Sequence, residues 1–433
     1  MYYFIGIKGA GMSALAQIMK KLGYDVMGSD LEKHFFTEEG LIQNGIEILP
    51  FNKDNIKEGM KIIRGATFTD EHEEVKRALE LDLKIYSYSE MVGSLTKKFS
   101  TIAIAGCHGK TTTTSMMSHV FSNLVGANYL IGDGTGSAEV GNEYFILEAC
   151  EYRRHFLNYV SKYAIITNID LDHVDYFKDI NDVIDAYEEY ANNAEKMVLA
   201  CGDDPYTHSL QTKNPIFFYG ISDDNDIKAV DIEYKETGTS FEVLVEDNYY
   251  GKFDLPIYGK HMLLDALAVI GTCYYERLEA KDVAKIFKTF EGAKRRFTEI
   301  VVGNNVIIDD YAHHPNELKA LINAVKQKYA NKKVAVIFQP HTFSRTKAFA
   351  NDLVNVLGKV DSSYILNIHP AREKQDDFEG ITSNIIIDNL DNSHLLDGDI
   401  SIAVNDSDTV YVFASPNDLS NYINDLKEIL ENK

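Results

Sequence analysis

The stretch TIAIAGCHGKTTTTSMMSHVF, residues 101–121, decides the fold class of this chain. An apolar run at 101–105 predicts a strand buried on both faces, and the glycine turn after it leads into a helical pattern. The turn resembles a phosphate-binding loop, except that Ile104 stands where GxxxxGK[ST] has its first glycine. Lys110 would still supply a mobile cation and Thr111 a hydroxyl for Mg²⁺. We therefore expect an ATP site at this turn.

The position of Lys110 strengthens this expectation. A lysine at the positive end of a helix dipole is unfavourable by about 0.3–1 kcal/mol unless an anion binds beside it. A bound phosphate therefore explains Lys110 better than a plain turn does. We expect Cys107, inside the turn, to fill space rather than to react.

A second glycine turn lies at the N-terminus, in the sequence YYFIGIKGAGMSALA. Gly9, Gly11 and Ala14 have the spacing of GxGxxG/A between a predicted strand and a predicted helix. Asp30 ends the second predicted strand and would accept hydrogen bonds from a ribose or a base. The turn predicts a diphosphate site for NAD, FAD or a UDP-sugar, with a βα turn that binds nothing as the alternative.

Candidate metal ligands follow two further strand-like runs. Glu148 and Glu151 lie in LEACEYRRHFL, and His173 lies in TNIDLDHVDYF. The carboxyl ends of parallel strands meet at one edge of a sheet, where ligands gather, and Mg²⁺ prefers oxygen ligands. A solvated carboxylate and an ordinary surface or core histidine are the alternatives.

Short apolar runs alternate with helical patterns along the whole chain, which predicts the α/β class with mostly parallel sheets. Residues 230–256 differ, because their period-2 pattern predicts an antiparallel hairpin. Breaks near residues 95–99 and 293–296 suggest three domains at 1–96, 97–294 and 295–433. Three domains also suit a length of 433 residues.

Composition excludes several classes of partner. With 43 basic and 66 acidic residues the net charge is -23, which repels nucleic acid and anionic lipid. Neither a signal peptide nor a membrane helix is indicated. The four cysteines contain no CxxC pair, which argues against a disulfide framework or a zinc site. We expect a cytoplasmic protein that binds neither nucleic acid nor membrane.

Taken together, the motifs resemble those of the Mur ligase family of peptidoglycan synthesis. They are GIKGAGMSALA, GSD, GCHGKTTT, EACEYRRHFL, TNIDLDHVD, RRF, DDYAHHP, FQPHTFSRT and HPAREK, in the family's order. The resemblance implies a Rossmann-like UDP-sugar domain at 1–96, a central P-loop-type ATPase domain with a mostly parallel sheet at 97–294, and a Rossmann-like amino-acid-binding domain at 295–433.

Within this family the motifs are most similar to those of ligases that join L-alanine to UDP-N-acetylmuramate. The resemblance implies that ATP phosphorylates the lactyl carboxylate, and that the amine of L-alanine then attacks the acyl phosphate. A murein peptide ligase that couples a preformed peptide, and a nucleotide-binding protein with impaired ATP use, are alternatives. A nicotinamide oxidoreductase built on the first turn would leave Lys110 unexplained. The resemblance is compatible with a monomer or a homodimer.

The resemblance also implies a role for individual residues. UDP would contact Gly9, Ala10, Gly11, Met12, Ser13 and Asp30. ATP would contact Gly106, Cys107, His108, Gly109, Lys110, Thr111, Thr112, His261, Asp265 and Arg295. Mg²⁺ would bind Thr111, Glu148 and His173. The catalytic set would be Lys110, Glu148, His173, Arg295, Asp309, His313, His314 and Arg345, with His313 or His314 as a base toward the amine.

Some segments depart from the family pattern. Met262 and Asp265 replace the two asparagines of GxHNxxNxxA, so we expect altered adenine contacts. Thr342 stands where many relatives have arginine, and residues 414–418 replace a Gly-Ala-Gly-Asp turn, so we expect altered C-terminal substrate contacts. Residues 179–195 contain no lysine, which predicts no carbamylated lysine of the kind that several sister ligases use.

Overall fold

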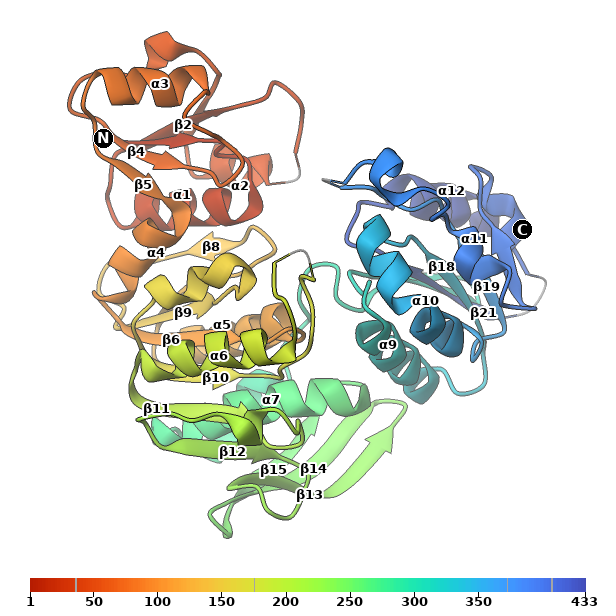
Figure 1. Ribbon diagram of the computed structural model, residues 1–433. Coiled ribbons are helices and arrows are strands. Elements are labelled where there is room, and N and C mark those ends of the chain that lie inside the picture. The colour runs from red at the N-terminus through yellow and green to blue at the C-terminus, as the bar shows by residue number, and fades with distance from the viewer. Residues whose placement is uncertain (36, 175, 372, 406–407) are drawn as a thin grey trace. The chain divides into compact units, whose positions relative to one another are not determined.

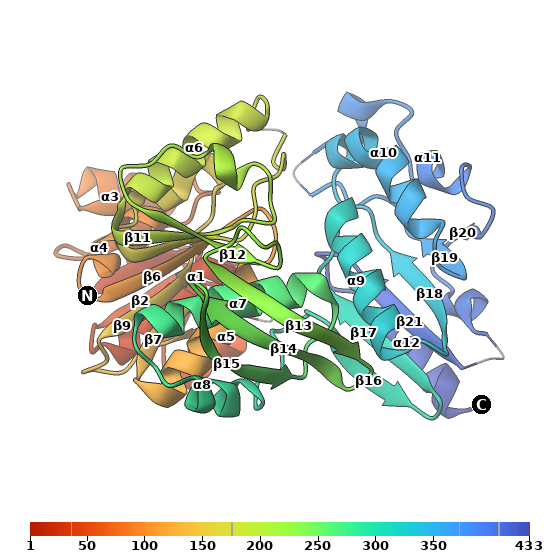
Figure 2. The ribbon, with the colours of Figure 1, turned by 90° about the horizontal axis from the view of Figure 1, so that it is seen from below.

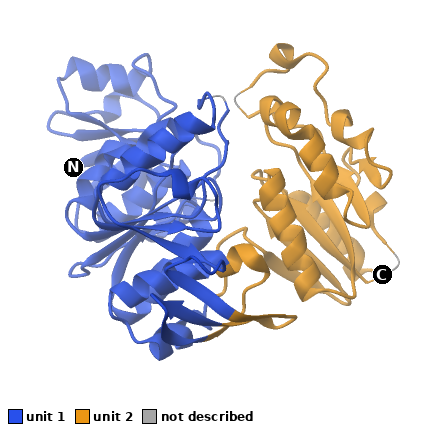
Figure 3. Cartoon of the chain, turned by 60° about the horizontal axis from the view of Figure 1, so that its bottom comes forward, with its two compact units in different colours: residues 1–230, 242–252, 264–290 blue, residues 231–241, 253–263, 291–433 orange. Residues whose placement is uncertain are grey.

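The computed structural model describes residues 1–35, 37–174, 176–371, 373–405 and 408–433. Its strands form three sheets, one in each of three α/β domains, as the resemblance implied (Figure 1). The chain divides into two compact units: unit 1 comprises residues 1–230, 242–252 and 264–290, and unit 2 comprises residues 231–241, 253–263 and 291–433 (Figure 3). The domain boundaries expected at 96/97 and 294/295 stay predictions.

The N-terminal sheet has the order β3-β2-β1-β4-β5, and its strands are parallel. Its elements are β1 (Tyr2–Ile5), α1 (Ala10–Lys21), β2 (Val26–Asp30), α2 (Glu38–Gln43), β3 (Glu47–Pro50), β4 (Lys61–Arg64), α3 (Glu73–Glu80), β5 (Ile85–Ser87) and α4 (Tyr88–Thr96). Successive residues of β1 point to opposite faces, so Phe4 packs in the core that contains α1 and Tyr3 in the one that contains α3. The strand order reverses at β1, which is where doubly wound sheets bind ligands.

The central sheet has ten strands in the order β15-β14-β13-β12-β11-β10-β6-β9-β7-β8. Its elements are β6 (Ser100–Ala105), α5 (Lys110–Leu124), β7 (Ala127–Leu130), β8 (Gly136–Ser137), β9 (Tyr144–Glu148), β10 (Ser161–Ile166), α6 (Ile180–Asn192), β11 (Ala194–Cys201), β12 (Ile216–Gly220), β13 (Ile227–Lys235), β14 (Gly238–Val245), β15 (Asn248–Leu255), α7 (Gly259–Tyr275) and α8 (Ala280–Phe287). Strand β6 pairs in parallel with both β9 and β10. The loops that follow these three strands therefore leave the same edge of the sheet.

The antiparallel patch expected at residues 230–256 is present, with three strands instead of a single hairpin. Only two residues separate β13 from β14 and β14 from β15, and connections this short join antiparallel neighbours. In the second turn, Glu246 and Asp247 have φ of 49° and 63°, as a type I′ hairpin turn requires.

The sheet of unit 2 has the order β16-β17-β21-β18-β19-β20. Its elements are β16 (Thr298–Val302), β17 (Asn305–Asp310), α9 (Pro315–Lys328), β18 (Lys333–Phe338), α10 (Phe343–Leu357), β19 (Ser362–Ile365), α11 (Asn384–Ile387), β20 (Ser393–Leu395), β21 (Thr409–Ala414) and α12 (Ser420–Glu431). Helices α9 and α10 and helix α12 belong with strand β21 in this domain (Figure 2). Val410 and Val412 of β21 pack in the core with α9 and α10, whereas Tyr411 and Phe413 pack in the core with α12. This alternation explains why β21 reads as an unbroken apolar run.

In unit 1 a single apolar cluster extends from Phe4 on β1 and Leu15 on α1 to Leu147 and Ile166 of the central sheet.

The four cysteines are free thiols. Within the described ranges, the chain contains no helix that combines the length and the apolar character needed to cross a membrane.

Candidate active site

The central glycine turn joins β6 to α5 and is fastened to the segment after β10. Gly109 has φ of 82°, and a Cβ there would lie 2.6 Å from Oδ1 of Asp265, so glycine is required. The carbonyl of His108 accepts hydrogen bonds from Oγ1 of Thr167 at 2.5 Å and from Nδ2 of Asn168 at 2.8 Å. These bonds hold the turn against the β10 edge.

Lys110 begins α5 and turns back toward the loop. Its Nζ donates to the Gly106 and Cys107 carbonyls and lies 3.1 Å from Oε1 of Glu151. Glu151 is buried, and its Oε1 also lies 3.5 Å from Nε2 of His173. Burial, the largest single influence, would lower the pKa of Lys110 and raise that of Glu151. Their mutual attraction, added to the nearby Glu148 for Lys110 and to His173 for Glu151, outweighs burial, so the pKa of Lys110 is raised and that of Glu151 is lowered. Both groups are therefore charged.

The predicted metal ligands make two separate contacts. Oγ1 of Thr111 donates to Oε2 of Glu148 at 2.9 Å, and this carboxylate also accepts from the Gly132 N–H at 3.0 Å. His173 contacts Glu151 instead. Thr111 comes after β6, Glu148 is the last residue of β9 and Glu151 follows that strand. Such oxygen donors suit Mg²⁺. The sequence names both Glu148 and Glu151 as candidates, whereas the family resemblance implies only Glu148.

Two other residues expected to contact ATP are buried. Cys107 Sγ donates to the Asp170 carbonyl at 3.0 Å and accepts from the Asp170 N–H at 3.1 Å. Burial raises the pKa of the Cys107 thiol well above its usual value, so the thiol is protonated and unreactive at neutral pH. Thr112 is buried on α5. Asp175 and Arg372, in two of the quoted motifs, lie outside the described residues.

In the N-terminal turn, Gly9, Ala10 and Gly11 are accessible whereas Met12 and Ser13 are buried. A Cβ at Gly11 would lie 2.8 Å from the Tyr88 ring, which explains the glycine. The Ser13 hydroxyl donates to the Thr37 carbonyl at 3.0 Å. Ser13 therefore ties α1 to the segment after β2.

Asp30 and Lys8 connect this turn to the same segment. Oδ2 of Asp30 accepts from the Lys8 N–H at 2.7 Å. Nζ of Lys8 donates to the carbonyls of Leu31 and Lys33 at 2.9 and 3.0 Å and lies 3.3 Å from Glu38. Sequence reasoning missed Lys8, although its position between the glycines of GIKGAG placed it in the turn.

A loop at residues 131–137 links the two turns within unit 1. Nε2 of Gln17, on α1, donates to the Gly134 carbonyl at 3.2 Å. A Cβ at Gly136 would lie 2.2 Å from the Ala14 carbonyl oxygen. The Gly132 N–H of the same loop reaches Glu148. The helix that begins at the N-terminal turn is thus connected to the carboxylates beside the central turn.

In unit 2, Arg295 acts as a clamp. Its Nε and Nη2 donate to the two oxygens of Asp309 at 3.1 and 3.3 Å. The same guanidinium donates to the carbonyls of Ser415, Pro416 and Asn417 at 2.7–3.1 Å. This loop replaces the family's Gly-Ala-Gly-Asp turn, and Arg295 with Asp309 fixes its path.

The two histidines of DDYAHHP differ in role. His314 is buried and caps α9, forming a capping box with Glu317. Nδ1 of His313 lies 3.1 Å from the Tyr311 carbonyl and 3.2 Å from Glu317. His313 is therefore better suited than His314 to exchange a proton.

The His313 ring begins a row of three imidazoles near α10. Its centroid lies 6.0 Å from that of His341, which stacks on His369 at 5.7 Å. Nη1 of Arg345 lies 3.3 Å from Nδ1 of His341. Glu373 accepts hydrogen bonds from the N–H groups that open α10. Sequence reasoning assigned no role to His369 or Glu373, although both lie in HPAREK.

Asp265 and His261, both expected to contact ATP, have different surroundings. Asp265 lies against the central turn in unit 1. His261 belongs to unit 2, where burial and nearby Arg296 lower the pKa of its ring to about 4. The imidazole is therefore neutral at pH 7.

Comparison with solved structures shows the same fold over the full length. The UDP-N-acetylmuramate–alanine ligase MurC of Thermotoga maritima superposes with a TM-score of 0.82 at 24% identity, covering 100% of this chain and 99% of that one. A murein peptide ligase of Psychrobacter arcticus gives 0.73 at 20% identity, with 100% and 99% coverage. The MurF ligase of T. maritima, solved in complex with ADP, gives 0.66 at 17% identity, with 88% and 97% coverage.

Family models account for nearly the whole chain. A Mur ligase family catalytic domain matches residues 1–100, a Mur ligase middle domain matches 104–273, and a Mur ligase glutamate ligase domain matches 295–426. Since these three models follow one another with only short gaps, the chain belongs to the Mur ligase family of ATP-dependent ligases of peptidoglycan synthesis.

Proposed function

We propose that this ligase joins L-alanine to the lactyl carboxylate of UDP-N-acetylmuramate through an acyl-phosphate intermediate. The observation that carries the proposal is the central turn, where Lys110 and Thr111 lie beside the carboxylates Glu148 and Glu151. Such a turn suits transfer of a terminal phosphoryl group. The full-length likeness to an alanine ligase, together with the motif set, favours L-alanine as the amine.

For phosphoryl transfer, the backbone N–H groups of Gly109 and of the first turn of α5 would bind the phosphates of ATP, whereas those of Cys107 and His108 donate to Asn168. Lys110, held as a cation by Glu151, would neutralise charge on the transferred group. We propose that Thr111, Glu148 and Glu151 hold Mg²⁺, with His173 beside Glu151. When bound, Mg²⁺ would neutralise phosphate charge during the transfer.

For the sugar nucleotide, we propose that the N–H groups at Gly9–Gly11 bind the diphosphate and that Asp30 accepts from the uridine part. The loop at residues 131–137 supports this assignment, because it touches both α1 and Glu148. A substrate held at the first turn can therefore extend its lactyl carboxylate along one continuous unit toward the phosphates.

For the second step, an amine attacks a carboxylate usefully only after phosphate has made a leaving group of one oxygen. The attacking amine must also lose a proton. Because Nδ1 of His313 lies near the Tyr311 carbonyl and Glu317, a proton there is stabilised, and Nε2 becomes the basic atom. We propose His313 as that base and Arg345 as a partner for a substrate anion.

The test is mass spectrometry of the products formed from UDP-N-acetylmuramate, Mg-ATP and an equimolar mixture of amino acids. We expect one product, heavier than the sugar nucleotide by one alanine residue, with one ADP formed per product. Omission of ATP is the control. A product that carries another amino acid would overturn the choice of L-alanine.

The murein peptide ligase alternative is tested in the same vessel, because a solved enzyme of that kind also matches the full chain. The tripeptide L-alanyl-γ-D-glutamyl-meso-diaminopimelate is added in competition with L-alanine. Preferential formation of the tripeptide product would favour this alternative. Nucleotide binding without any ADP release would favour a binding protein with impaired ATP use.

The cytoplasm supplies ATP and sugar nucleotides, and it is the compartment we propose.

A further inference from the structure

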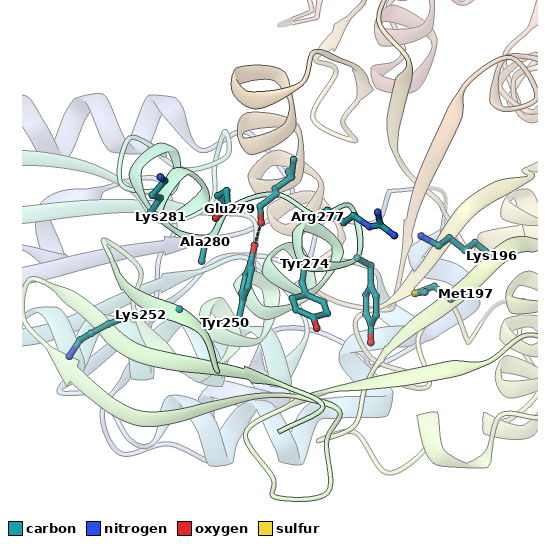
Figure 4. A pocket seen from close by; sticks show the side chains of 12 residues that line it. Lys196, Met197, Tyr250, Lys252, Tyr274, Arg277, Glu279, Ala280 and Lys281 are labelled. Atoms are coloured by element: carbon teal, nitrogen blue, oxygen red, sulfur yellow. Dashed lines mark hydrogen bonds between the residues drawn. The ribbon is translucent and has the colours of Figure 1, made fainter. Parts of the chain in front are cut away.

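A cavity of ≈ 910 Å³ lies in unit 1 between β11, β15 and the junction of α7 with α8 (Figure 4). Twelve residues line it, and none belongs to either glycine turn or to the carboxylates beside them. Asp265 touches the central turn, and Tyr274 at the cavity lies nine residues further along α7, about 14 Å at 1.5 Å per residue. The cavity is therefore distinct from the proposed active site.

The lining is strongly cationic. Lys196, Lys252, Arg277 and Lys281 line the cavity, against a single acid, Glu279. The chain as a whole has 66 acidic and only 43 basic residues. In the part of the chain that the structure describes, Lys252, Arg277 and Lys281 make neither an ion pair nor a side-chain hydrogen bond. Such a concentration of positive charge in an acidic protein attracts an anion.

Aromatic rings form the middle of the cavity. The centroids of Tyr250 and Tyr274 are 5.3 Å apart, those of Tyr274 and Tyr275 are 5.4 Å apart, and both pairs are nearly perpendicular. The Tyr250 hydroxyl donates to the Leu278 carbonyl at 2.7 Å, which fixes the first ring. In Figure 4, Tyr250 and Tyr274 lie between Lys252 on one side and Arg277 on the other. The cavity thus offers aromatic surface flanked by cations.

Arg277 occupies a position where glycine is the usual residue. The Leu278 N–H bonds the Cys273 carbonyl and the Arg277 N–H bonds the Tyr274 carbonyl, so α7 ends in a Schellman motif. Arg277 occupies the left-handed position of this motif, with φ of 61°, which costs about 1 kcal/mol relative to glycine. Arg277 lines the cavity. A binding role for its guanidinium would explain why arginine occupies this strained position.

We propose that this cavity binds a phosphorylated small molecule with a planar ring, of about the size of a mononucleotide. Arg277 would pair with the phosphate, since a guanidinium offers two parallel donors to phosphate oxygens. The ring would pack on the tyrosines, which offer base-sized π surfaces. Cavities of about 300–1,000 Å³ accommodate ligands of this size.

Pyridoxal 5′-phosphate is a suitable probe, because it combines a planar ring, a phosphate and an aldehyde. Its aldehyde condenses with a lysine ε-amine with loss of water, and borohydride then reduces the imine to a stable secondary amine. Peptide mapping of the full chain, labelled with no nucleotide present, locates the labelled lysines, and any label on Lys110 of the central turn is scored separately. We expect Lys196, Lys252 or Lys281 to be labelled in preference to other exposed lysines. Labelling spread evenly over the surface would overturn the proposal.

Arg277→Gly supplies the decisive variant, because glycine suits the left-handed position and should preserve the fold. We expect labelling of the cavity lysines to fall about tenfold, with the melting temperature retained or raised. Lys57→Gln, which removes one exposed cation from the N-terminal domain, is the matched control and should leave the labelling unchanged. Unchanged labelling in Arg277→Gly contradicts the proposed phosphate contact.

Protection experiments test the ring. UMP or AMP should protect the cavity lysines at lower concentration than inorganic pyrophosphate does. Equal protection by pyrophosphate would show that the tyrosines contribute nothing and would overturn the assignment of a planar ligand. The experiment is independent of the proposed ligase reaction, because it reads labelled peptides and not turnover.

Discussion

The two glycine turns of unit 1 have the same strand–turn–helix arrangement but differ in the charges around them. Each joins a central parallel strand to a helix and uses glycine where a Cβ would collide with a neighbour. In the N-terminal turn the lysine, Lys8, points away to hold the segment after β2, and the acid Asp30 binds the turn. In the central turn, Lys110 opens the helix itself and is paired with buried Glu151.

We infer from this difference that the turn provides an anion site and that its surroundings select the chemistry. A diphosphate that is only bound needs N–H groups and a fixed neighbouring segment. A phosphoryl group that is transferred also needs a cation and metal ligands at the same place. The comparison predicts that substitutions at the central turn affect catalysis, whereas those at the N-terminal turn affect substrate affinity.

The largest effect is expected from Lys110→Met. The activity should fall by about 10³-fold or more, since the cation at the transferred phosphate is lost. The variant should also lose about 3 kcal/mol of stability, because buried Glu151 loses its main partner. Adding Glu151→Gln should restore the melting temperature without restoring activity. Lys213→Met, at an exposed site of the same domain, is the control.

Next, Glu151→Gln should reduce kcat more than Glu148→Gln does. Glu151 contacts both Lys110 and His173, whereas Glu148 contacts Thr111 and a backbone N–H. We expect losses of about 10² and about 10, each with a higher Mg²⁺ requirement, measured by titrating Mg²⁺ at saturating ATP. A larger loss for Glu148→Gln would instead support the ligand set Thr111, Glu148 and His173.

At the N-terminal turn, Asp30→Asn should raise KM for the sugar nucleotide by about tenfold to a hundredfold and change kcat little. The reason is that Asp30 lies where a bound nucleotide is held and not where phosphate is transferred. KM for ATP should stay unchanged, and Asp25→Asn, at an exposed site before β2, serves as control. A fall in kcat with KM unchanged would contradict the prediction that the N-terminal turn affects substrate affinity and not catalysis.

The smallest effect is expected from Cys107→Ala. Burial raises the pKa of this thiol above its ordinary value near 9, so thiolate forms only at still higher pH. Activity should stay within about threefold of the parent, and alkylation of Cys107 by iodoacetamide should remain slow at pH 7–8.5. Rapid inactivation by iodoacetamide, prevented in Cys107→Ala, would show a reactive thiol in the turn.

Sequence reasoning succeeded where the interaction is local. It located both glycine turns, the parallel strands before them and the antiparallel patch, because hydrophobic period and glycine spacing depend on neighbours in the chain. The capping role of His314 was also readable, since Glu317 follows it three residues later. Residues 148 and 151 could not be ranked in this way, because spacing does not say which carboxylate reaches Lys110.

The amino-acid sequence by itself determined the α/β class and the two glycine turns, which follow from local patterns, and the family, which follows from nine motifs in order along the chain. Only the tertiary structure decided that Glu151 is the partner of Lys110, that Lys8 and Arg295 fasten loops, and that a cationic cavity lies between β11, β15 and the junction of α7 with α8. The physical reason is that these contacts join residues from separate strands and loops, and their geometry exists only once the sheets have assembled.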